Sequence, residues 1–77
     1  MTEWFGIDTA LVLLNRAEKT GEGVTTFKGY GRNPRVFAAK VVRTPTEMKV
    51  FIDNKFKKTC TLESQVIDLL VEEAEKF

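Results

Sequence analysis

Basic side chains in the middle of the chain are the residues whose type and spacing point most clearly to chemistry, namely the binding of phosphates or carboxylates. Residues 28–58 contain nine Lys or Arg residues and two Asp or Glu residues, a net charge of +7, whereas residues 1–27 carry −2 and residues 59–77 carry −4. A basic segment between acidic ends is typical of a surface for phosphates or for an acidic partner. Solvated strands whose lysines protect sheet edges give the same pattern, and this alternative stays open.

Catalytic and metal-binding side chains are scarce. The chain has no histidine, which removes His-based acid–base pairs and His metal ligands, and its one cysteine, Cys60, cannot form an internal disulfide or a Cys-rich zinc site. We therefore predict a protein that is not an enzyme, with no catalytic residues, no metal and no cofactor. Cys60 is interpreted as a small buried residue rather than a reactive thiol.

Length and composition predict one small globular domain over residues 1–77. Hydrophobic residues make up 43% of the chain and charged residues 30%, which is an ordinary globular mixture. The longest aliphatic run, residues 11–14, is far shorter than a membrane span, and no basic segment of a secretion signal is visible. With a lone cysteine as well, these features predict an intracellular protein, cytoplasmic or nuclear, that does not contact membranes.

The hydrophobic pattern predicts two helices and three strands. Residues 2–19 and 60–77 have the apolar spacing of amphipathic helices, while residues 24–30, 35–43 and 47–53 are rich in β-branched and aromatic types. Short connections favour an antiparallel sheet with both helices on one face. We therefore predict an α+β fold of order α-β-β-β-α with a three-stranded antiparallel sheet. Its predicted core consists of Ile7, Leu11, Leu14, Phe27, Phe37, Val41, Val50, Val66 and Leu70.

Two segments allow alternatives. Trp4 and Phe5 precede the apolar stripe of the first helix, and they form either a lid over the core or an exposed anchor for a partner. Residues 55–61 form either the first turn of the second helix or a fourth short strand, and their Thr-Cys-Thr stretch favours the strand locally.

Short motifs along residues 8–77 resemble the double-stranded RNA-binding domain. They lie on the first helix, the first two strands and the start of the second helix of that family. The motifs are Leu13-Leu14-Asn15, Phe27, Asn33-Pro34-Arg35-Val36-Phe37, Phe37-Ala38-Ala39-Lys40-Val41 and Lys57-Lys58-Thr59-Cys60. The resemblance implies binding of double-stranded or structured RNA by its shape and its phosphates.

The resemblance also implies where RNA would be held. Three lysines would contact phosphates across the major groove, next to the N-terminus of the second helix, and two polar clusters would enter successive minor grooves. The lysines are Lys55, Lys57 and Lys58. The minor-groove residues are Arg32, Asn33 and Arg35 in the connection between the first two strands, and Asn15 and Arg16 on the first helix.

A second resemblance is to the small Alu-RNA-binding proteins of the signal recognition particle, which are also α-β-β-β-α. The segment 22–32 is similar to their first strand and its loop, and residues 57–61 are similar to their basic third strand. This resemblance requires a strand, not a helical turn, at residues 55–61.

Protein–protein interaction is the alternative function. The glycines and the loop histidine of the double-stranded RNA-binding domain are absent here, and domains of that family without their RNA motifs often dock on proteins or dimerise. Alternation along the strands places four apolar residues on the sheet face that the helices do not need. These residues, which would bind a protein partner or a second copy, are Val36, Ala38, Val42 and Phe51.

Overall fold

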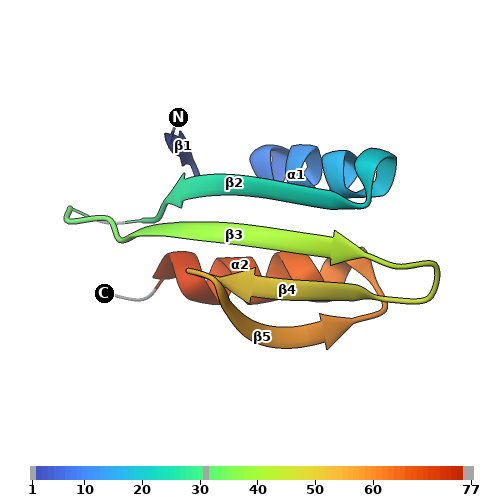
Figure 1. Cartoon of the computed structure of the whole chain (residues 1–77). Coiled ribbons are helices and arrows are strands. Elements are labelled where there is room, and N and C mark those ends of the chain that lie inside the picture. Colours follow the sequence, from blue (N-terminus) through green and yellow to red (C-terminus); the bar gives the residue numbers. More distant parts are fainter. Residues whose placement is uncertain (1, 31, 76–77) are drawn as a thin grey trace.

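A mixed five-stranded sheet with two helices forms the fold in the computed structural model, which describes residues 2–30 and 32–75 (Figure 1). The order of elements is β1 (Thr2–Trp4), α1 (Ile7–Thr20), β2 (Glu22–Lys28), β3 (Val36–Arg43), β4 (Met48–Ile52), β5 (Lys55–Cys60) and α2 (Glu63–Glu75). The α+β class and the two helices are therefore confirmed. Residue 31, in the expected turn after β2, and residues 76–77, at the end of the expected second helix, lie outside the described residues.

The predicted three-stranded antiparallel sheet is wrong, because a further strand pairs at each edge. The strands are arranged β1-β2-β3-β4-β5, and β1 runs parallel to β2 while the other neighbours are antiparallel. Strand β1 reaches its partner through α1, as a crossover between parallel strands requires. The Phe5 N–H extends this pairing by donating to the Lys28 carbonyl over 2.9 Å.

The strand is the correct alternative for residues 55–61. Asp53 and Asn54 have φ values of 52° and 67°, and two central residues of positive φ make the tight hairpin turn that matches the twist of the strands. Strand β5 therefore folds back along β4, and α2 begins only at Glu63. This strand is also what the resemblance to the Alu-RNA-binding proteins requires locally.

Both helices cover the same face of the sheet and close one core against it (Figure 1). Leu14 from α1 and Val66 and Leu70 from α2 are buried there, as predicted. Ile7 and Leu11 are not, since 64% and 46% of their surfaces are exposed. The first turns of α1 carry apolar residues on several sides, so the sequence pattern allows either of two apolar stripes to face the sheet. The sheet receives the stripe that carries the small residues, which let the helix approach closely: Ala10, Leu13, Leu14 and Ala17.

Trp4 and Phe5 have different surroundings: Phe5 is the expected lid, while Trp4 is exposed and its role as an anchor for a partner stays a prediction. Phe5 is buried, and its ring contacts Phe27 edge to face with the ring centres 5.3 Å apart, so it is the expected lid. Trp4 is on β1 with 62% of its surface exposed. Alternation along β1 therefore leaves one aromatic side chain at the surface of the sheet.

Candidate nucleic-acid interface

Charge is segregated between the strands and the second helix. Strands β3, β4 and β5 contain six Lys or Arg residues and no Asp or Glu, whereas α2 contains five Asp or Glu residues and no Lys or Arg. The helices lie on one side of the sheet, and within residues 2–30 and 32–75 no element covers the other side (Figure 1). Of these six basic residues, Lys40 and Lys49 are on the uncovered side of the sheet. Arg43, Lys55 and Lys58 lie opposite the buried Met48, Ile52 and Val50 in the register and are therefore on the side of the helices.

The uncovered surface, called the open face below, consists of the strand residues that alternate with the buried ones. Seven of its residues are apolar or aromatic, three are lysines, three are threonines and one is a glutamate. They are Thr2, Trp4, Glu22, Val24, Thr26, Lys28, Val36, Ala38, Lys40, Val42, Lys49, Phe51, Phe56 and Thr59.

Aromatic rings on the open face lie beside cations. The Lys28 ammonium is 4.6 Å from the centre of the Trp4 ring, and the Lys40 ammonium is 5.5 Å from that of Phe51. Phe51 and Phe56 meet edge to face with their ring centres 5.6 Å apart. Such cation–ring contacts hold the lysines over the sheet.

The three predicted lysines lie on the edge strand β5, and all three are exposed. A bulge interrupts the pairing of β5, because Val50 pairs with Lys58 and Phe51 with Phe56, which leaves Lys57 as an extra residue. The Lys57 ammonium lies 3.9 Å from a carboxylate oxygen of Glu73 on α2. Lys57 is therefore partly committed to an internal ion pair, whereas no ion pair of Lys55 or Lys58 is found among the described residues.

The expected contribution of a helix N-terminus to the lysine site is absent. The last two residues of β5 and two further residues separate Lys58, the last of the three lysines, from the start of α2 at Glu63. The Gln65 side-chain oxygen accepts the backbone N–H groups of Thr61 and Leu62 over 3.0 and 3.2 Å. With these donors satisfied and Glu63 in the first turn, this helix end has little affinity for a phosphate.

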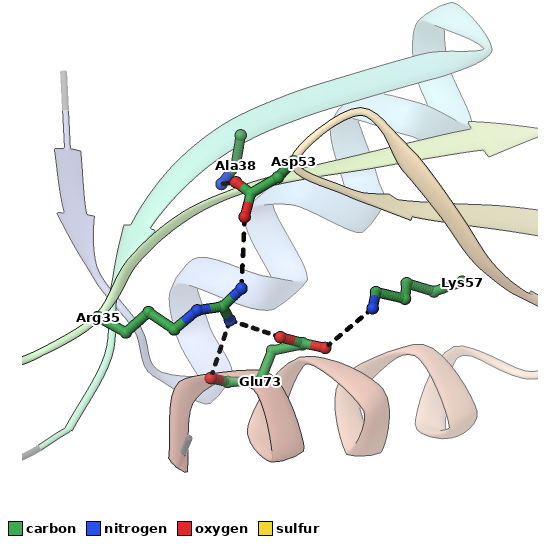
Figure 2. A network of polar contacts seen from close by, with 5 residues as sticks. All are labelled: Arg35, Ala38, Asp53, Lys57 and Glu73. Carbon is green, nitrogen blue, oxygen red and sulfur yellow. Dashed lines mark hydrogen bonds and ion pairs between the residues drawn. The ribbon is translucent and has the colours of Figure 1, made fainter. Parts of the chain in front are cut away.

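Arg35 lies at the centre of an internal ion-pair network rather than free in a loop (Figure 2). Its guanidinium donates to the carboxylate of Glu73 and lies 3.3 Å from that of Asp53. The other Asp53 oxygen accepts the Ala38 N–H over 3.0 Å. Glu73 is only 2% exposed. The network ties the start of β3 to α2 and to the β4–β5 turn, so Arg35 has a structural role here.

The remaining predicted RNA-binding residues lie on two other parts of the molecule. Arg32 and Asn33 are exposed in the β2–β3 connection. Asn15 and Arg16 are exposed on α1, where the Arg16 guanidinium donates to the Val24 carbonyl of β2 over 3.4 Å. Since β2 and β5 are separated by two strands, the structure does not bring the predicted RNA-binding residues together on one surface.

The alternative interface residues do share one surface. Val36, Ala38 and Val42 from β3 and Phe51 from β4 are all on the open face, and Val36 is 55% exposed. The sequence interpretation considered Trp4 only as an alternative anchor for a partner, and it did not list Phe56 or the three lysines of the open face among the interface residues. Strand alternation alone could have placed the lysines there, whereas Trp4 and Phe56 depend on β1 and β5.

In comparisons with known proteins, no protein-family model matches the chain, and no curated protein or solved structure matches it significantly. In the part of the chain that the structure describes, neither helix is long and apolar enough to cross a membrane. Among these same residues, no group of three or more Cys, Asp or Glu side chains is placed to hold a metal ion.

Proposed function

We propose that this chain is a non-enzymatic RNA-binding module that holds structured RNA by its phosphates along strands β3, β4 and β5. The observation that carries the proposal is the charge segregation: six basic and no acidic residues on these strands, and five acidic and no basic residues on α2. A polyanion approaching such a dipolar molecule is attracted to the strands and repelled by the helix.

The chemistry of these strands suits phosphates better than base edges. Lysine is a flexible point charge that neutralises a phosphate without reading sequence. Duplex RNA hides its bases in a deep and narrow major groove, so a protein meets mainly phosphates and 2′-hydroxyls. Lys55 and Lys58 are exposed on the edge strand and bear the contact, while Lys57 and Arg35 are engaged with Glu73.

A salt-dependent titration with a duplex RNA of about 16 base pairs tests the proposal. Each lysine that neutralises a phosphate contributes about 0.7–0.9 to the slope of log affinity against log salt. Replacing both Lys55 and Lys58 with Ala should therefore weaken binding and lower the slope by up to about 2, with an unchanged circular dichroism spectrum. Lys58→Ala alone should lower the slope by up to about 1. Lys19→Ala, which removes an exposed lysine of α1, is its matched control. Absence of wild-type binding at low salt, or equal losses at Lys19 and Lys58, contradicts the proposal.

Docking on a protein, including a second copy of the chain, is a second candidate function. The observation that favours it is the common placement of Val36, Ala38, Val42 and Phe51 on the open face. Val42→Glu should convert an associated species into a folded monomer, because a carboxylate buried in an apolar contact is costly. Sedimentation velocity measures this, and wild-type protein that stays monomeric at high concentration excludes the homodimer.

A further inference from the structure

The open face combines exposed aromatic rings with cations, and the proposed function does not use the rings. Trp4 is at one edge of the sheet, and the contacting pair Phe51 and Phe56 is toward the other. We propose that the open face binds an unpaired RNA strand by stacking bases on Trp4 and on Phe56, with lysines neutralising the phosphates between them. This inference rests on the proposed function and adds the class of RNA and the mode of contact.

The Trp4 end has the features of a stacking site. The indole ring has 62% of its surface exposed although it belongs to a paired strand. Lys28 is opposite Trp4 in the register, with its ammonium 4.6 Å from the ring centre. A base stacked on the indole would place its phosphate near this ammonium, so the base and the phosphate of one nucleotide would each contact the protein.

The Phe56 end also has an exposed ring, and its cation lies over the neighbouring ring of Phe51. Phe56 is 55% exposed on β5, and its edge-to-face contact with Phe51 fixes the orientation of its ring. Lys40 lies over Phe51, with 5.5 Å between its ammonium and the ring centre. The Glu22 carboxylate lies 3.1 Å from the Lys40 ammonium, so one side of the site ends at an acidic residue.

The distance between the two aromatic sites suits a strand of several nucleotides. In the strand register Trp4 pairs with Lys28, and Phe51 pairs with Lys40. Lys40 in turn pairs with Val24, which is four residues before Lys28 on β2. Phe56 pairs with Phe51, so Trp4 on β1 and Phe56 on β5 are separated by four strand spacings across the sheet and four residues along it, about 19 and 13 Å, or roughly 23 Å on the diagonal. This distance exceeds one stacked base, so the strand would cross the sheet diagonally.

The sheet surface between the two aromatic sites is formed by small side chains, and some of them carry hydroxyl groups. Thr26 is opposite both Thr2 and Ala38 in the register, and both of these neighbours are small. Small side chains leave space for a sugar–phosphate backbone over the middle of the sheet. The threonine hydroxyls can donate to or accept from a ribose 2′-OH, which is the group that distinguishes RNA from DNA.

Charge decides between an RNA strand and an apolar protein on this face. Lys28, Lys40 and Lys49 lie among the apolar residues of the open face and are balanced there only by Glu22. An apolar partner would remove the ammonium groups of Lys28 and Lys49 from water, and Glu22 compensates only that of Lys40. A phosphodiester chain compensates the charges while its bases cover the rings.

The single tryptophan of the chain gives a direct test. An oligouridylate of about 12 nucleotides, a length within the range that single-strand sites cover, is titrated while the fluorescence of Trp4 is followed. Stacking should quench the fluorescence, and Phe56→Ala should weaken binding about 5- to 150-fold, the range measured for removal of one stacked base. Leu62→Ala is the matched control, since Leu62 is 59% exposed but lies after β5 rather than on the open face. Circular dichroism confirms that each variant is folded.

The outcomes separate this inference from the proposed function. If the Lys55 and Lys58 variants lose affinity while Phe56→Ala does not and Trp4 fluorescence is unchanged, the stacking inference is wrong and phosphate binding stands. If the wild type binds neither oligouridylate nor duplex at low salt, the proposed function fails as well. Equal affinity for oligothymidylate overturns the assignment to RNA. A concentration-dependent change of Trp4 fluorescence without RNA shows instead that a second copy covers the face.

Discussion

Removal of the Arg35 guanidinium is a sensitive test of how this small fold is held together, because one side chain joins three elements (Figure 2). Arg35 precedes β3, Asp53 is in the β4–β5 turn, and Glu73 is on α2. Arg35→Ala removes one cation from the buried Glu73 carboxylate, which keeps the Lys57 ammonium at 3.9 Å. The variant should therefore lose stability by more than an ordinary surface ion pair contributes.

The size of the loss follows from burial. Breaking a buried ion pair by removing one partner costs about 3–5 kcal/mol. The Arg35 side chain is 32% exposed, so water can enter its place and reduce the cost, and the contact with half-exposed Asp53 adds little. We expect a net loss of about 2–4 kcal/mol in the free energy of unfolding. For a domain of this size, that loss lowers the Tm by roughly 10–25 °C.

Urea unfolding followed by circular dichroism measures the loss, and two further variants identify its cause. Glu73→Gln keeps the shape and one acceptor but removes the charge, so its loss should be smaller, about 1–2 kcal/mol. Replacing Arg35 with Met and Glu73 with Leu together removes both charges, and this double variant should be more stable than Arg35→Ala. A loss below about 0.5 kcal/mol for Arg35→Ala, or a double variant no more stable than Arg35→Ala, contradicts the role of this network.

Three further predictions concern the core and the thiol. Val66→Ala should cost about 1–4 kcal/mol in urea unfolding, because Val66 is fully buried; a neutral effect means that the core is assigned wrongly. Gly29→Ala should destabilise by about 1–3 kcal/mol in the same assay, since its Cβ would lie 2.5 Å from the Ala74 carbonyl oxygen. Burial raises the pKa of the Cys60 thiol against the opposing effect of Lys58, so iodoacetamide should label native protein slowly and urea-unfolded protein fast. Because the pKa of the thiol is higher in the folded protein, its protonated form stabilises the fold at pH values below the unfolded thiol's pKa of about 8.5. This contribution is lost as the pH rises above that value. Above it, the free energy of unfolding should therefore fall more steeply with pH for wild type than for Cys60→Ala.

The parts of the fold that the sequence predicts well are those with a long periodic pattern. Strands β2, β3 and β4 and helix α2 lie close to their predicted positions, because each contains several apolar residues at strand or helix spacing. The first helix was predicted from residue 2, but α1 begins at Ile7 and residues 2–4 form β1. Strand β1 has three residues, too few for alternation to be visible. Strand β5 is exposed at its first five residues and contains a bulge, so its period is broken. Its turn residues Asp53 and Asn54 were the local signal for the hairpin.

The surface was harder to predict because its residues are placed by contacts between distant parts of the chain. Arg35 and Glu73 are 38 residues apart in sequence, and no local pattern shows that they pair. The placement of Val36, Ala38, Val42 and Phe51 on one face was predictable from alternation alone. Trp4 and Phe56 join that face only because β1 and β5 pair at the sheet edges.

The measurement that tests the central claim most directly is an NMR titration of ¹⁵N-labelled protein with a short RNA hairpin that has a single-stranded tail. The account predicts that amide signals of β3, β4 and β5 shift, together with the Trp4 indole N–H signal, while signals of the acidic helix α2 stay in place. Higher salt should reverse these shifts, because phosphate contacts release counterions. Shifts confined to the helices, or no shift at low salt, would contradict the claim that the basic strands form an RNA-binding surface.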